Sequence, residues 1–113
     1  MEKITKKKLV EGLDNAFDII TNGWCKHASF LDKDGKPCSK EQAKSMCMGS
    51  AMDESIPVYF QNHLMKKIGV IATSYPSVID FNDSEATSKG DVLAALSKMK
   101  EYVQNNTLST IYS

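Results

Sequence analysis

Apolar residues near the start of the chain recur at spacings of three and four. This places them on one face of a helix over about residues 6–21: Leu9, Leu13, Ala16, Phe17 and Ile20. Thr5 is the predicted N-cap, and Ile4 is spaced to pack against Leu9 across it. The pair Asn22-Gly23 predicts a left-handed stop at the far end. The apolar face must be buried against another part of the chain.

Apolar and polar residues partly alternate over residues 23–39, and Asp34-Gly35 marks a turn within them. The pattern predicts a short β-hairpin or an extended arm. Pro37 has no N–H to donate to a strand ladder, so it keeps the second limb at an edge or ends it. A hairpin this short needs helices behind it to be stable.

A second helix is predicted to begin after Ser39, because Ser39 and Gln42 have the spacing of a capping box. Residues beyond it recur at helical spacing: Ala43, Met46, Cys47, Ser50 and Ala51. Together with Gly49 they form a face of small side chains that lets another backbone come close. We expect this face to pack against the first helix.

Ser55 and Pro57 predict the start of a third helix, because both residue types favour a helix N-terminus. An apolar stripe with four-residue spacing follows, and Gly69 predicts its end: Ile56, Phe60, Leu64 and Ile68. Residues 70–76 are then expected to be extended or turn-like, and residues 77–82 to form one helical turn.

Thr87 or Ser88 is predicted to cap a last helix, since Ser88 has Asp91 three residues later. Its buried face is periodic: Val92, Leu93, Leu96, Met99 and Val103. The helix should end near residues 105–106, after which the tail either frays or docks. The predicted fold class is mainly α. We expect about four main helices with a short β-hairpin or extended arm between the first and second, in a single small globular domain over residues 1–113.

Composition narrows the classes of partner. Apolar residues make up 42% of the chain and charged residues 25%, which is the balance of a globular protein that folds alone or as a small oligomer. The 14 basic and 14 acidic residues cancel, and every basic residue is lysine, so we expect no sequence-specific nucleic-acid partner. No apolar stretch is long enough for a membrane span, and we expect no membrane partner.

Three lysines, Lys6, Lys7 and Lys8, fall in the first turn of the first predicted helix, where the helix dipole disfavours cations. We interpret them as a solvated, solubilising end whose local stability is not optimised. The alternative is a weak anion-binding patch.

Cysteine usage predicts reduced thiols and a cytoplasmic protein, because the number of cysteines is odd and the first residues lack the apolar core of a signal peptide. The thiols and imidazoles suffice in number for a zinc site: Cys25, His27, Cys38, Cys47 and His63. Only Cys25 and His27 are close enough in sequence to form a ligand pair. The spacing therefore argues against zinc, and we predict no metal and no cofactor.

The candidate ligand-binding residues are Trp24, Cys25, Asn82 and Asp83. Trp24 is interpreted either as a structural plug or as a stacking platform. Cys25 is a nucleophile only if its thiol pKa is lowered and a histidine bonds to it. Asn82 and Asp83 either line a polar pocket or are turn formers that satisfy backbone N–H groups. No known catalytic motif is present, so the sequence predicts no catalytic residue.

Five short motifs occur in an order that resembles an uncharacterised domain family of bacterial and phage proteins: Gly23-Trp24-Cys25, Asp32-x-Asp34-Gly35, Cys47-x-Gly49-Ser50-Ala51, Ile79-x-Phe81-Asn82-Asp83, and Thr87 before Asp91-Val92-Leu93. The resemblance spans about residues 9–103. The chain departs from the family pattern at Met46 and Phe81, where tryptophan is expected, and at Ser50, where alanine is expected. His27 and Cys38 fall outside the pattern. The resemblance implies a fold and a phage or prophage setting, and no reaction.

The leading hypothesis for function is a non-enzymatic binding domain. We expect an accessory, anti-defence-like protein of a phage or mobile element that sequesters a small nucleotide-like ligand, with Trp24 stacking on the base. Two alternatives stay open. One is an inhibitor that binds a host protein through its surface. The other is a small thiol-dependent or hydrolytic enzyme centred on Cys25 with Asn82 and Asp83.

Overall fold

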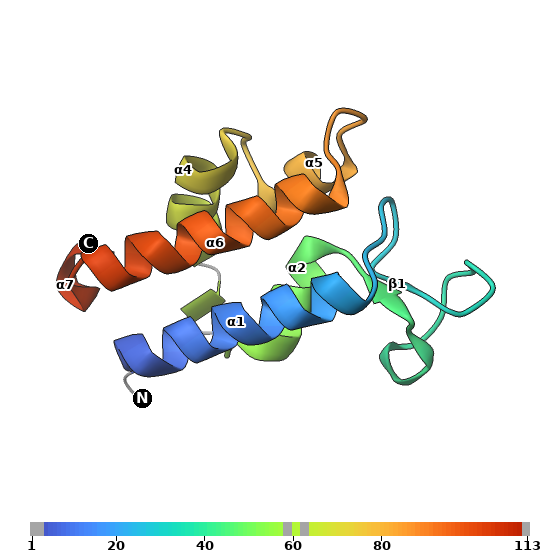
Figure 1. The fold of residues 1–113 in the computed structure, drawn as a ribbon, viewed down its shortest axis with the longest axis horizontal. Helices are drawn as coiled ribbons and strands as arrows, with labels where there is room; N and C mark the ends of the chain where they lie inside the picture. Colours follow the sequence, from blue (N-terminus) through green and yellow to red (C-terminus); the bar gives the residue numbers. More distant parts are fainter. Residues whose placement is uncertain (1–3, 58–59, 62–63, 112–113) are drawn as a thin grey trace.

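The computed structural model describes residues 4–57, 60–61 and 64–111. It confirms the predicted class: a mainly helical protein with a two-stranded antiparallel hairpin between its first two helices (Figure 1). The elements follow in chain order as α1 (Lys6–Asn22), β1 (Phe30–Leu31), the 3-10 turn η1 (Lys40–Gln42), β2 (Ser45–Met46), α2 (Met48–Ser55), the π-helix η2 (Leu64–Gly69), α4 (Val70–Thr73), α5 (Val78–Asp83), α6 (Lys89–Asn105) and α7 (Leu108–Ile111). Residues 23–47, between α1 and α2, are called the arm below.

The long helices α1 and α6 run antiparallel side by side (Figure 1), and their predicted apolar faces meet. Most of the side chains that the periodicity placed on these faces are almost completely buried: Leu9, Leu13, Ala16, Ile20, Val92, Leu96, Met99 and Val103. Phe17 and Leu93 are only partly buried and pack against this core. Each large apolar side chain removed from water in this way contributes about 1.5–3 kcal/mol. None of the described helices is long and apolar enough to span a bilayer.

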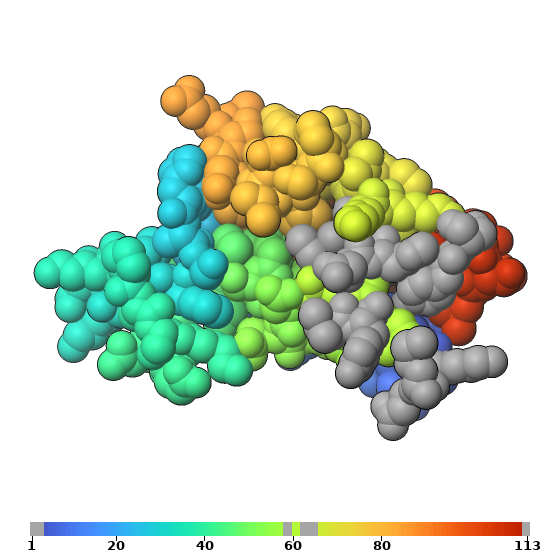
Figure 2. All heavy atoms as spheres, turned by 180° about the vertical axis from the view of Figure 1, so that it is seen from behind, coloured from blue at the N-terminus to red at the C-terminus, as the bar shows by residue number. Residues whose placement is uncertain are grey.

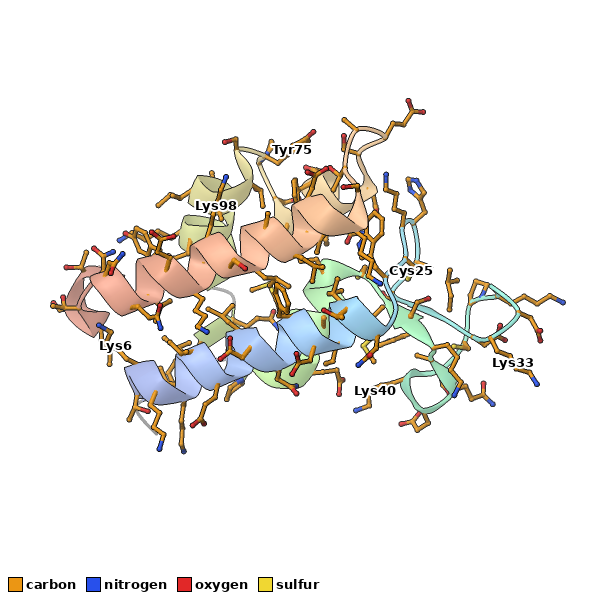
Figure 3. All side chains as sticks on the ribbon, in the orientation of Figure 1. Lys6, Cys25, Lys33, Lys40, Tyr75 and Lys98 are labelled. Atoms are coloured by element: carbon orange, nitrogen blue, oxygen red, sulfur yellow. The ribbon has the colours of Figure 1, made fainter. Side chains whose placement is uncertain are left out.

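Two lysines cap the α1–α6 pair reciprocally. Lys6, in the first turn of α1, donates through Nζ to the Gln104 carbonyl oxygen at the end of α6 (3.0 Å; Figure 3). Lys89, in the first turn of α6, donates to the Thr21 carbonyl oxygen at the end of α1 (2.7 Å). Because the helices are antiparallel, each ammonium lies near the negative end of the neighbouring dipole. Lys6 is therefore more than the solvated side chain that the sequence predicts, whereas Lys7 and Lys8 are exposed.

Lys6→Ala and Lys89→Ala are each expected to lower the free energy of unfolding by about 0.5 kcal/mol, because each leaves a C-terminal carbonyl without its cation. Chemical denaturation at low ionic strength measures this loss, which should shrink in high salt. Lys7→Ala is the control and should leave stability unchanged or raise it slightly. Equal losses from Lys6→Ala and Lys7→Ala would contradict the capping role.

The second helix begins at Met48, so its predicted start after Ser39 is wrong. Ser39 makes no capping hydrogen bond through its side chain, and only the short turn η1 follows it. The chain then extends, and Met46 bonds to the Gly23 and Cys25 backbones. These long-range backbone bonds replace the local capping box. The N-cap of α2 is Cys47, whose Sγ accepts from the Ser50 N–H (3.4 Å).

Gly23 ends α1 in a way that the sequence did not indicate. Its φ of 175° is extended, not left-handed, so the predicted left-handed stop is wrong. A Cβ at this position would instead collide with the Lys44 carbonyl oxygen of the arm. Glycine is required here by the close approach of two backbones.

Gly23→Ala is therefore expected to destabilise the protein strongly, by about 2 kcal/mol or more, because the arm must move away from α1. The matched control is Gly90→Ala on α6, where an added Cβ would meet its nearest neighbour, Ser88 Oγ, at 3.6 Å. That change should stabilise the protein by up to about 1 kcal/mol, since alanine has the higher helix propensity. Thermal denaturation of both variants distinguishes a steric requirement from a general cost of replacing glycine.

The region of the third predicted helix differs from expectation at both ends. Ser55 is the last residue of α2 and donates its hydroxyl back to the Ala51 carbonyl oxygen, so it ends a helix where the sequence predicts the start of one. Helical structure continues beyond Gly69 through α4, and the chain turns at Ser74, whose φ is 63°. Parts of the predicted span, 58–59 and 62–63, lie outside the described residues.

The remaining predictions hold at the C-terminal half. Ser77 caps α5 by accepting from the Asp80 N–H (3.0 Å). Ser88 and Asp91 form the predicted capping box of α6. Of the two outcomes open for the tail, docking is observed, because α7 buries Ile111 completely.

Candidate functional site

The Trp24–Cys25 segment of the arm and the Asn82–Asp83 segment of α5 lie against each other, although they are far apart in sequence. Figure 2 shows the cyan base of the arm beside the orange atoms of α5, while the outer part of the arm projects away from the helices. Asn82 is at the contact and only 1% exposed. Its Oδ1 accepts two hydrogen bonds, from Trp24 Nε1 (2.7 Å) and from the Met48 backbone N–H (2.9 Å).

The other half of the Asn82 amide is also used. Nδ2 donates to the Cys25 carbonyl oxygen (3.1 Å) and to Asp83 Oδ1 (3.0 Å). Both donors and both acceptor positions of the carboxamide are therefore satisfied within the protein. Asn82 joins the arm, the start of α2 and α5, and it keeps no polar capacity for a ligand. It is a structural residue whose side chain satisfies a backbone N–H, as one of the two interpretations from the sequence expected, although that N–H belongs to Met48 and not to a local turn.

Trp24 is half-buried and packs against the core. Besides its bond to Asn82, its ring has the Lys26 Nζ 5.4 Å from its centroid, a cation–π contact. Lys26 also donates to the Ser84 carbonyl oxygen (2.6 Å), which holds the ammonium in place. The geometry favours the structural-plug interpretation of Trp24, because a lysine covers the ring and the indole N–H is already bonded.

Cys25 lies at the base of the arm (Figure 3) and is 6% exposed. Burial raises the pKa of the Cys25 thiol above its ordinary value, and a hydrogen bond with Ser45 offsets only part of this effect. The thiol donates to the Ala28 carbonyl oxygen (3.4 Å). A buried, protonated thiol is the opposite of what a nucleophile requires.

Asp83 holds the next part of the arm. Its Oδ1 accepts from the His27 backbone N–H (2.9 Å), and this hydrogen bond is the main reason that the pKa of Asp83 is lowered. His27 has a φ of 61°, an uncommon conformation for a residue other than glycine. The stabilisation is complete above the unfolded-state pKa of about 3.9 and is lost as the pH falls through the lower folded-state value.

An open cavity of about 220 Å³, called the arm pocket, lies between the arm, the start of α2 and α5. Its lining residues are His27, Ala28, Ser29, Cys47, Ile79, Asn82 and Asp83. Within the described part of the chain, Asp83 Oδ2 makes no hydrogen bond, its nearest partner being His27 Nδ1 at 3.9 Å. The Ser29 hydroxyl also has no partner there. The pocket therefore offers one carboxylate oxygen, an imidazole and a hydroxyl to a ligand.

Of the four site residues predicted from the sequence, two line the arm pocket and two do not. Asn82 and Asp83 line the arm pocket, whereas Trp24 and Cys25 are not among its lining residues. Sequence reasoning missed Ala28 and Ser29, for which no motif gave a signal, and it quoted Ile79 only as part of a motif without assigning it to the site. It considered His27 as a zinc ligand, and Cys47 as a zinc ligand or as part of a helix face. The sequence predicted Cys47 to lie within a helix. In the structure α2 begins only at Met48, so Cys47 is its N-cap and lies at the pocket.

The described residues include no group of three or more His, Cys, Asp or Glu side chains placed to hold a metal ion. The three cysteines are free thiols. His63, which the sequence considered as a reserve ligand, lies outside the described residues. His27 and Asp83 together provide only two ligand side chains, fewer than the four of a structural zinc site.

Comparison of the chain with protein-family models, with curated proteins and with solved structures finds no match. The resemblance to a bacterial and phage family therefore stays a prediction, and function must be argued from the site itself.

Removing the Asn82 amide is expected to destabilise the protein. Asn82→Ala leaves the buried Met48 N–H and the Cys25 carbonyl without partners, at a cost of about 3 kcal/mol. Asn82→Asp is nearly isosteric but replaces the donor half of the amide with charge beside Asp83, so it should be equally harmful. Urea denaturation measures both. Asn105→Ala, at an exposed position near the end of α6, is the control. Wild-type stability of Asn82→Asp would contradict the assigned hydrogen bonds.

Proposed function

We propose that this chain is a non-enzymatic binding domain whose arm pocket holds a small cationic group that donates hydrogen bonds. The observation that carries the proposal is Oδ2 of Asp83, a residue that lines the open cavity. Within the described residues this oxygen makes no hydrogen bond and has only the His27 imidazole at 3.9 Å, while Oδ1 is fixed by the arm. The lowered pKa keeps this carboxylate ionised at neutral pH. Hydrogen bonds from a cation to a carboxylate are stronger than those between neutral groups.

The groups around Asp83 support a cationic ligand over an anionic one. Lys26 is close enough to contribute to the low pKa of Asp83, but its ammonium is bonded to the Ser84 carbonyl oxygen. A phosphate in the arm pocket would face the Asp83 carboxylate. A guanidinium or alkylammonium group would instead gain a charge-assisted bond to Oδ2 and lie within reach of the lining hydroxyl of Ser29.

Binding is favoured over catalysis because the candidate reactive groups are engaged elsewhere. The Cys25 thiol is buried and protonated, and the Asn82 amide is fully bonded. The Cys47 sulfur accepts from the Ser50 N–H and contacts the Ser50 hydroxyl (3.3 Å). The thiol-dependent enzyme considered from the sequence thus lacks an activated nucleophile at Cys25.

The nucleotide-like ligand and the phage setting stay predictions. A cavity of about 220 Å³ is smaller than the roughly 300–1,000 Å³ typical of small-molecule sites, so it suits part of a ligand or a single side chain. The second hypothesis, a protein partner, fits this size because such a partner can insert one side chain into the cavity. Ile79 is 60% exposed at the rim and offers apolar contact beside the carboxylate. A basic side chain with an apolar neighbour would use both features.

The test is an NMR titration of the ¹⁵N-labelled protein with methylguanidinium, butylammonium and adenosine monophosphate in turn. Saturable shifts at the amides of His27, Ser29 and Ile79 are expected with the cations only, with affinities on the order of millimolar. Asp83→Asn keeps an oxygen to accept from His27 and removes the charge, so it should weaken cation binding by tenfold or more.

Asp80→Asn is the matched control, since it removes an exposed carboxylate from the same helix and should leave binding unchanged. Saturation by adenosine monophosphate alone would overturn the cationic class and favour the nucleotide. Absence of all three responses would overturn the arm pocket as a binding site. Cation binding that survives Asp83→Asn would contradict the role of this carboxylate.

A further inference from the structure

A second cavity, of about 300 Å³, lies between α4 and α6, away from the arm pocket. We call it the α4–α6 groove; its lining includes Ile68, Ile71, Ala72, Lys98, Glu101 and Tyr102. Ile71 is 56% exposed, and its neighbour Val70 is 37% exposed. These are two of the three large apolar side chains that are exposed in the described part of the chain. Of the two, only Ile71 lines the groove, where its side chain is the exposed part of an apolar patch completed by Ile68 and Ala72.

Two unpaired charges of opposite sign accompany this patch. Lys98, labelled beside α4 in Figure 3, and Glu101 are three residues apart on α6 and share one side of the helix. Both are exposed, and within the described residues neither forms an ion pair. Lys100, on another face of the same helix, does pair with Asp14 of α1 (2.9 Å). The groove thus presents one cation and one anion beside apolar surface.

From this pattern we infer that the α4–α6 groove is where a second copy of the chain docks. In a two-fold dimer the same surface meets itself, so residue i contacts j while j contacts i. Two α6 helices packed antiparallel across such an axis would bring Lys98 of each copy to Glu101 of the other. Ile71 of each copy would then cover the apolar part of the facing groove.

The charge pattern favours a second copy over an unrelated partner. A partner with charge of one sign would satisfy either Lys98 or Glu101 and face repulsion from the other. A second copy satisfies both at once. The formal net charge of zero also means that two copies do not repel each other over distance. Because the patch is small, we expect a weak, concentration-dependent dimer. This inference is independent of the ligand proposed for the arm pocket.

Sedimentation velocity of the full chain, from low micromolar to near-millimolar concentration, tests the inference. The wild type should pass from monomer to dimer over this range. Lys98→Glu and Glu101→Lys should each weaken dimerisation about tenfold or more, since each places like charges together twice across the axis. The double variant Lys98→Glu/Glu101→Lys should restore it, because the opposite charges meet again. Only a symmetric interface predicts this rescue.

Ile71→Asp should abolish dimerisation, whereas Ile79→Asp, which alters an equally exposed isoleucine on α5, should leave it intact. All these positions are exposed, and circular dichroism checks that the variants remain folded. A wild type that stays monomeric throughout would overturn the inference and leave the groove for a different protein. Failure of the double variant to recover, or equal loss from Ile71→Asp and Ile79→Asp, would also overturn it.

Discussion

The position of the arm depends on one buried carboxamide. Asn82 accepts from the indole of Trp24 and from the first N–H of α2, and it donates to the backbone at Cys25. A buried polar group that loses a partner costs about 1–3 kcal/mol, so the bonds of a saturated amide favour one arrangement over its alternatives. The arm has only a two-residue strand pair of its own, which is not stable by itself. Asn82 therefore supplies the order that the arm lacks.

The arm pocket follows from this order. Once Asn82 fixes the base of the arm, the adjacent Asp83 reaches the His27 N–H and holds that residue at positive φ. Gly23 also helps to fix the arm, because the absence of a side chain lets the Lys44 carbonyl oxygen pack against the end of α1. Two consecutive residues of α5 thus have different roles. Asn82 has no hydrogen-bonding capacity left for a ligand, whereas Asp83 keeps one oxygen for the cavity.

Local pattern predicted those parts of the fold that local interactions decide. α1 and α6 have continuous apolar stripes and caps within the same turn, at Thr5 and Ser88, so their positions follow from the sequence. The start of α2 does not, because the Ser39 capping box competes with backbone bonds from Met46 to residues far earlier in the chain. The reason for Gly23 is likewise a contact with Lys44. The sequence predicted the two segments that meet at the site. It could not predict which of their residues line the cavity, because that depends on long-range contacts and not on a local periodic pattern.

This division of roles changes what the family resemblance implies. The motif residues Gly23, Trp24 and Asn82 lie in the buried junction, where backbone approach and hydrogen bonding explain their identity without any ligand. His27 and Ser29 line the arm pocket but fall outside the motifs. Asp83, which carries the proposed ligand contact, is itself a motif residue. A related chain could therefore keep the junction and this carboxylate while changing the lining residues outside the motifs, which would alter the ligand that fits.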